Sequence, residues 1–107
     1  MNDIEKIYPF VVVDDVSGSL NQIIYKVGNL CIGQIFFQCI GAVGEYGEVF
    51  RMSMYPKETT HCKILNLSKA GKPMSATLQN TGFITLDAEQ SLNVNEYYMA
   101  YIFFLIN

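Results

Sequence analysis

Short runs of apolar residues, many of them β-branched or aromatic, alternate with turn residues along most of this chain. The runs lie at residues 10–13, 23–27, 30–40, 49–54, 61–67, 74–78, 83–86 and 97–106. Gly28-Asn29 and Asn80-Thr81-Gly82 separate neighbouring runs and are typical of hairpin turns. Short runs with turn signals about every 8–12 residues indicate strands. The sequence therefore predicts an all-β fold, a jelly-roll-like or Greek-key β-sandwich of about eight antiparallel strands.

The domain organisation follows from the length and from the first residues. A chain of 107 residues is the size of one domain. Residues 1–9 are predicted to be a lead-in segment, in which Ile4, Ile7 and Tyr8 allow one helical turn that Pro9 ends. Residues 10–107 are predicted to form the single β-sandwich domain, with a turn at Ser17-Gly18-Ser19.

Two of the predicted strands depart from the usual alternation of apolar and polar residues. Residues 97–106 are apolar on both faces, and residues 30–40 are interrupted only by Gln34 and Gln38. A strand of a small sandwich normally has one face in the core and one in water. A second apolar face predicts contact with another subunit, and we expect Phe36, Tyr101 and Phe103 at this interface.

Composition and charge exclude several classes of protein. Half of the residues are hydrophobic, 16% are charged and the net charge is −3, so the chain is not intrinsically disordered. The sequence contains no basic cluster, which argues against nucleic-acid binding. The longest apolar run has ten residues, about half of what a membrane-spanning helix needs, and the acidic N-terminus is not typical of a signal peptide. We therefore expect no membrane insertion.

Three cysteines, Cys31, Cys39 and Cys62, have no paired spacing. Cys31 and Cys39 lie on one predicted strand and are too far apart for a disulfide. We expect three reduced, buried thiols and synthesis in a reducing cytoplasm.

The sequence offers little for catalysis or metal binding. His61 is the single histidine, and its neighbour Cys62 points to the opposite face of a regular strand, so the two cannot form a dyad. Asp14 and Asp15 could form a calcium site with Asp87 or Glu89 if their loops met, but solvated turn carboxylates are the simpler interpretation. We expect no enzyme activity, no metal site and no cofactor.

A loop with three glycines, residues 41–47, contains the best candidate ligand-binding residues. Tyr46 follows Glu45 in this loop, and Tyr55 lies beside Pro56 at the end of a strand. An exposed tyrosine ring can pack on the C–H face of a sugar while a carboxylate accepts hydroxyl hydrogens. Glu45, Tyr46 and Tyr55 are therefore predicted to bind a saccharide. The alternative is that Tyr46 and Tyr55 only cover the rim of the sandwich.

The order of these motifs resembles a known family. The stretch Tyr25-Lys26-Val27-Gly28-Asn29 is followed by a long strand at 30–40, the glycine-rich loop, a strand that leads to Pro56, a Gly82-Phe83 hairpin and a tyrosine-rich last strand. This order is similar to that of the C-terminal head domains of siphophage receptor-binding, baseplate and tail-fibre proteins. Met54-Tyr55-Pro56-Lys57 departs from a Leu-Pro-x-Gly-Tyr-Arg-Pro segment frequent in that family. The resemblance implies a homotrimer with jelly-roll-like heads around a threefold axis.

These observations lead to three hypotheses for function. The first is a non-catalytic bacteriophage virion component, made in the bacterial cytoplasm, whose trimeric fibre or baseplate head attaches to saccharides of the host surface. The second is a capsid-fibre, decoration or adaptor subunit that binds other virion proteins and no sugar. The third is a cellular trimeric jelly-roll module for signalling or binding.

Overall fold

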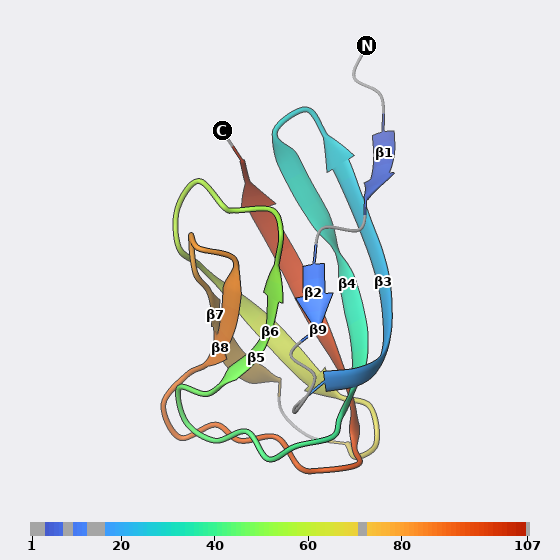
Figure 1. The fold of residues 1–107 in the computed structure, drawn as a ribbon, viewed down its shortest axis with the longest axis vertical. Helices are drawn as coiled ribbons and strands as arrows, with labels where there is room; N and C mark the ends of the chain where they lie inside the picture. The colour runs from blue at the N-terminus through green and yellow to red at the C-terminus, as the bar shows by residue number, and fades with distance from the viewer. Residues whose placement is uncertain (1–3, 8–9, 13–16, 71–72, 107) are drawn as a thin grey trace.

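The computed structural model describes residues 4–7, 10–12, 17–70 and 73–106, and within them the fold contains strands and no helix. Eight strands coincide with the predicted runs, and one more lies in the N-terminal segment. An all-β, antiparallel fold is therefore confirmed. The strands are β1 (Ile4–Ile7), β2 (Phe10–Val12), β3 (Ser17–Val27), β4 (Leu30–Cys39), β5 (Glu48–Met52), β6 (Thr60–Asn66), β7 (Met74–Leu78), β8 (Phe83–Leu86) and β9 (Tyr97–Leu105) (Figure 1).

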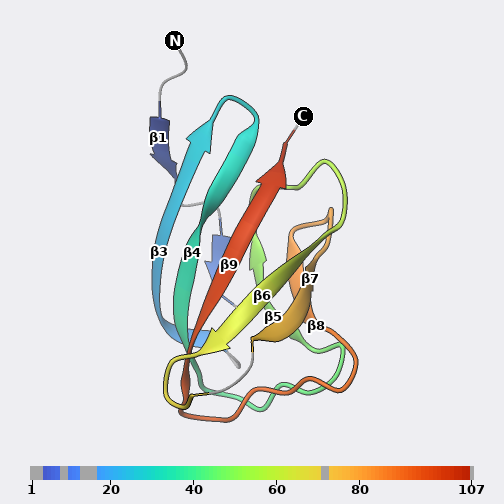
Figure 2. The same ribbon diagram turned by 180° about the vertical axis from the view of Figure 1, so that it is seen from behind.

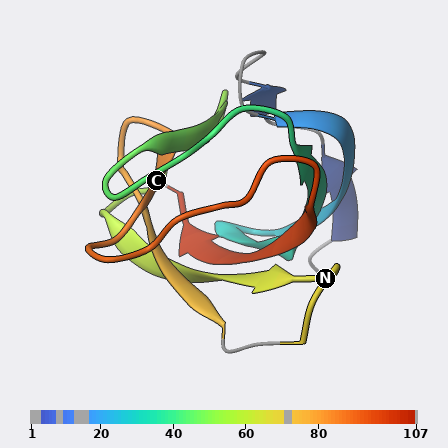
Figure 3. The same cartoon turned by 90° about the horizontal axis from the view of Figure 1, so that it is seen from below.

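All nine strands belong to one hydrogen-bonded sheet with the order β1-β3-β4-β9-β6-β7-β8-β5-β2. The sheet curls into an open half-barrel, and its last strand, β2, returns to the side of β3 (Figure 3). The hydroxyl of Ser17, on β3, donates a hydrogen bond of 2.7 Å to the carbonyl of Val49, on β5, across the same place. The strand pairing is continuous from β1 to β2 because β9 pairs with both β4 and β6, whereas a sandwich was expected to have two separate sheets.

Strands β5–β8 have Greek-key connectivity. β5 precedes β6 in the chain, but it pairs with β8, so that β6-β7-β8-β5 are neighbours in this order. β9 lies in the middle of the sheet, between β4 and β6 (Figure 2). The C-terminal strand therefore joins the two halves of the curled sheet.

Both predicted hairpin turns are confirmed, and glycine is needed in each. Gly28 has a φ of 60° in the turn between β3 and β4, and Gly82 has a φ of 93° in the turn between β7 and β8. Such angles favour glycine because it has no Cβ. A Cβ at position 82 would also lie 2.4 Å from the carbonyl oxygen of Met52.

The concave side of the sheet holds the core. The ring of Phe37 stacks on Tyr98 with a centroid distance of 5.8 Å, and it meets Phe50 edge to face at 5.5 Å. Aliphatic side chains from β3 to β9 complete this cluster, among them Ile24, Ile35, Ile64, Leu78, Ile84 and Ile102. Because these residues alternate with more exposed ones along most of these strands, β3 to β9 each have one face in the core.

Two local predictions near the N-terminus were wrong. Ile4–Ile7 forms the edge strand β1, paired with Ile24–Val27 of β3, in place of a helical turn. The Ser17-Gly18-Ser19 segment forms the start of β3 in place of the predicted turn. The pairing of β3 with β4 shifts its register between Gly18 and Asn21, and this shift accommodates the glycine and the serines within the strand. In both places long-range pairing overrides the local preference of the residues. Val13 of the first predicted strand, and Asp14 and Asp15, lie outside the described residues.

Candidate functional site

The second apolar face predicted for residues 30–40 and 97–106 is the convex side of strands β3, β4 and β9. Phe36, Tyr101 and Phe103 point to this side, because their neighbours Ile35, Phe37, Ile102 and Phe104 are buried in the core. We call this surface the outer face and define it by Tyr25, Ile32, Phe36, Tyr101, Phe103 and Leu105.

Most of the outer face is open to solvent in the isolated chain. The exposed fraction is 60% for Phe103 and 44% for Tyr101, while Phe36 is half-buried. Phe103 lies opposite Ile32, and Tyr101 lies opposite Gln34, so the apolar side chains are adjacent across β4 and β9. A contiguous apolar patch of this kind is typical of a protein–protein interface.

The outer face also contains a hollow of about 320 Å³. The side chains of Tyr25 and Tyr101 lie on its two flanking strands, and Gln34 lies between them on β4. Gly33 is one of the lining residues, and the backbones of β3 and β4 come so close there that a Cβ would lie 2.2 Å from the carbonyl oxygen of Ile23. The hollow is therefore lined by aromatic and aliphatic side chains together with the amide of Gln34.

Glu45 and Tyr46 lie in the loop between β4 and β5, at the opposite end of the molecule from the C-terminus (Figure 1). The Tyr46 side chain is 68% exposed, and its φ of 62° is unfavourable for a residue with a Cβ. The Glu45 carboxylate accepts a 2.7 Å hydrogen bond from the backbone N–H of Glu89, in the loop between β8 and β9. Glu45 thus joins two loops, and Tyr46 presents its ring to solvent.

Tyr55 does not share a site with Glu45 and Tyr46. The five residues of β5 separate them, a distance of about 17 Å along a strand. The Tyr55 ring lies at the other end of the molecule, next to Gly82. A Cβ added to Gly82 would lie 3.1 Å from Cδ1 of this ring. It is 62% exposed and packs on the turn between β7 and β8. The three predicted ligand residues therefore form two separate groups.

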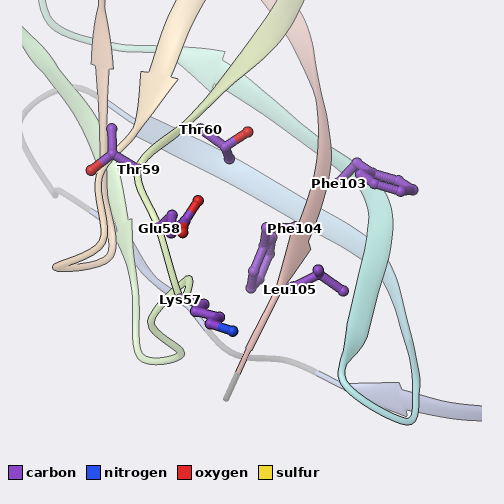
Figure 4. Close-up of a pocket in the computed structure, with 7 residues that line it drawn as sticks. All are labelled: Lys57, Glu58, Thr59, Thr60, Phe103, Phe104 and Leu105. Carbon is purple, nitrogen blue, oxygen red and sulfur yellow. The ribbon is translucent and has the colours of Figure 1, made fainter.

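A second hollow, of about 290 Å³, lies between the β5–β6 connection and the end of β9 (Figure 4). Lys57, Glu58 and Thr60 point toward it from one side, and the Phe104 ring points toward it from β9. Phe103 and Leu105 contribute to its lining, but their side chains point away toward the outer face. The hollow combines an apolar wall with hydroxyl, carboxylate and ammonium groups.

Glu96 is the carboxylate with the most hydrogen bonds in the described part of the chain. Its Oε1 accepts hydrogen bonds from the side-chain amides of Asn93 and Asn66 at 2.8 and 3.0 Å, and from the hydroxyl of Tyr98 at 3.3 Å. Its Oε2 lies 3.0 Å from Nζ of Lys69. The hydrogen bonds from Asn93, Lys69 and Asn66, with that from Asn93 as the largest cause, lower the pKa of Glu96 to about 2. Glu96 holds the β8–β9 loop against the residues that follow β6.

We expect the Glu96→Gln variant to melt a few degrees below the wild type at pH 7. The folded state lowers the pKa of Glu96, so the stabilisation is present above its ordinary value of 4.5 and is lost as the pH falls toward about 2. The difference in melting temperature should therefore shrink between these pH values. Circular dichroism melts from pH 7 to pH 2 measure it, with the exposed Glu58→Gln as control. An equal difference at pH 7 and at pH 2 would contradict this role.

The cysteines are placed as predicted. Cys31, Cys39 and Cys62 are free and buried. Burial, with the nearby Asp87 carboxylate, raises the pKa of Cys62 to about 12. An unreactive thiol follows, since the thiolate is the nucleophilic form. His61 is exposed on β6.

Sequence reasoning missed the hollow lined by Lys57, Glu58, Thr60 and Phe104. Its existence depends on β6 and β9, which are about 40 residues apart in the chain. Pro56 and the polar residues after it predict a connection, but no local pattern indicates how far this connection lies from β9.

Comparisons with protein-family models, with curated proteins and with solved structures found no match to this chain. Among the described residues, no helix is long and apolar enough to span a membrane. The same residues contain no group of three or more histidine, cysteine or acidic side chains placed to hold a metal ion.

Proposed function

We propose that this chain is a non-catalytic assembly and attachment module, a homotrimeric head domain of a bacteriophage fibre or baseplate that binds saccharides of the host surface. The observation that carries the proposal is the outer face, where Tyr101, Phe103 and their neighbours expose a continuous apolar surface on a folded domain. The location in a virion and the threefold arrangement are proposed because the order of motifs resembles that of siphophage head domains.

In the proposed trimer, the convex side of β4 and β9 faces the threefold axis, and the concave side remains the core of each subunit. The outer faces of the three subunits then cover one another, and this buries the apolar surface that the isolated chain leaves exposed. This arrangement explains why β4 and β9 are the strands with apolar residues on both faces, whereas β6 has Lys63 and His61 among its outward residues.

In the proposed attachment, the loop of Tyr46 contacts the saccharide. The support is that neither packing nor backbone preference explains an aromatic residue at this position, because the ring is exposed and the φ is positive. Glu45 holds the loop through its bond to Glu89 and retains an oxygen for a sugar hydroxyl.

Tyr46→Ala is expected to remove adsorption to host cells or to their wall polysaccharide without changing the melting temperature or the mass of the assembly. Loss of an aromatic contact weakens one site by about 0.5–1.5 kcal/mol. Three linked sites multiply this loss. Adsorption of the purified variant to cells measures it, with Tyr55→Ala as the matched control at the other end. Unchanged adsorption of a folded Tyr46→Ala trimer would exclude this loop.

A capsid-fibre or decoration subunit is the second candidate function. The outer face favours it as well, because the patch suits protein partners and does not require a sugar site. Binding of wall polysaccharide separates the two functions.

A further inference from the structure

Strands β1 and β2 follow each other in the chain but lie at opposite ends of the strand order. β1 pairs with β3 at one end, and β2 pairs with β5 at the other end (Figure 1). The described structure does not pair the two strands with each other. We call residues 4–12 the N-terminal arm. Because the edge of a sheet presents main-chain groups that an extended segment can bind, the arm occupies two strand-binding edges of one open sheet.

The edge of β3 matches β1 in its side chains as well as in its main chain. Ile7 lies opposite Ile24 and packs against the core. Glu5 lies opposite Lys26, on the same side of the sheet as Ile7. Opposite charges placed directly opposite each other stabilise an antiparallel pair, and the apolar pair fixes its register. The β3 edge therefore suits an antiparallel segment with a carboxylate two residues before an apolar side chain.

β1 contributes little to the core and lies at the rim of the outer face. Three of its four residues are exposed, among them Ile4 at 70%, while Ile7 is partly buried. Ile4 lies opposite Val27, and Val27 lies opposite Leu30. Leu30 in turn lies opposite Leu105, which belongs to the outer face. This apolar row places β1 beside the surface where the copies meet in the proposed trimer.

We propose that the N-terminal arm of each copy pairs with β3 and β5 of a neighbouring copy, so that the copies of the trimer exchange their arms. The inference rests on the proposed trimer, because a single chain has only its own two edges to bind. Every copy has the same arm and the same edges, so exchange keeps all pairs of β1 and β2. Such an exchange of identical elements is a low-cost route to an assembly.

The position of β1 favours the neighbouring copy as the acceptor. Contact between outer faces brings the β3 edge of one copy close to the arm of the next, because both border this contact. Ile4, which is exposed in the isolated chain, is then covered where the copies meet. Dissociation of an exchanged trimer requires the pairs of β1 and β2 to open, whereas contact between outer faces alone does not. The exchanged arms therefore hold the copies together.

A disulfide between β1 and β3 shows which chain supplies the arm. Ile4 lies opposite Val27, and opposite residues of an antiparallel pair have Cα atoms about 4.5–5.5 Å apart, which a disulfide spans. We expect the oxidised Ile4→Cys/Val27→Cys variant to run on a denaturing, non-reducing gel as species of two and three chains. Native mass spectrometry before oxidation checks that this variant has the same mass as the wild type.

A second cysteine pair is the matched control. Val27 lies opposite Leu30 across the turn that contains Gly28, so these two positions belong to one hairpin of one chain in any assembly. The oxidised Val27→Cys/Leu30→Cys variant should therefore run as a single chain. The three native cysteines are buried and are the same in both variants.

Co-expression of two single variants tests the exchange independently. The Ile4→Cys and Val27→Cys chains have one new cysteine each, so a bond between positions 4 and 27 forms only between two chains. We expect a cross-linked pair with one chain of each kind, which mass spectrometry recognises by the two substitutions. Either variant expressed alone should give no such pair. Absence of the mixed pair from a folded trimer would overturn the proposal.

These measurements distinguish failure of the exchange from failure of the proposed function. If the native mass is that of three chains and the bond between positions 4 and 27 lies within one chain, the trimer stands and the exchange is overturned. The exchange is also overturned if the trimer keeps both new thiols free while the control pair forms its bond, because the arm then pairs with no β3 edge. If the wild type has the mass of one chain, both proposals fail.

Discussion

Phe104→Ala is expected to lower the free energy of unfolding by about 3–5 kcal/mol, the usual cost of removing a buried phenylalanine. Phe104 is 3% exposed and belongs to the core cluster. A domain of this size is stable by only about 5–15 kcal/mol. The variant should therefore be largely unfolded or aggregated at 37 °C. Urea denaturation followed by circular dichroism measures the loss.

The neighbouring residue provides a matched control for this change. Phe103 is 60% exposed, because the two side chains point to opposite faces of β9. Phe103→Ala removes the same atoms from the outer face, so the fold of the subunit should survive while self-association weakens. If the two variants unfold at the same urea concentration as the wild type, the described core is wrong.

Phe103→Asp is expected to separate the assembly into folded single subunits. In the proposed trimer the new carboxylate would lie at every subunit contact without a partner, and burial of an unpaired charge costs several kcal/mol. Each 1.4 kcal/mol weakens association tenfold, so the variant should be monomeric at micromolar concentration. Sedimentation velocity measures the mass, and circular dichroism confirms the β fold.

A charge elsewhere on the surface controls for this experiment. Thr81→Asp adds the same carboxylate to the exposed turn between β7 and β8 and should leave the assembly intact. If Phe103→Asp has the same mass as Thr81→Asp, the outer face is not the subunit contact.

The strands were predictable because their signals are local. Runs of β-branched and aromatic residues, with Gly28 and Gly82 in the turns, mark eight strands and two hairpins, although β3 begins at Ser17 and not at Ile23. The edge strand β1 was missed because Ile4–Ile7 is short and gains its structure from pairing with β3. The continuity of the sheet could not be predicted either, since it depends on the pairing of β9 with β4 and with β6, strands that are distant from it in the sequence.

The sites were predictable only in part. The apolar character of residues 97–106 predicts a second apolar surface, and the alternation of burial along β9 places Tyr101 and Phe103 on the exposed side while Tyr98 and Phe104 fill the core. Tyr46 and Tyr55 were predicted to be neighbours because they are only nine positions apart in the sequence. The strand between them carries them to opposite ends. The parting of β6 and β9 has no local signal, because it is a property of three strands together.

The mass of the wild-type protein in solution tests the central claim most directly. Native mass spectrometry at micromolar concentration should give three times the chain mass of 12.1 kDa, because in the proposed trimer two further copies cover the apolar outer face. A stable, soluble species of 12.1 kDa under the same conditions would contradict the trimer and remove the basis of the proposed head domain.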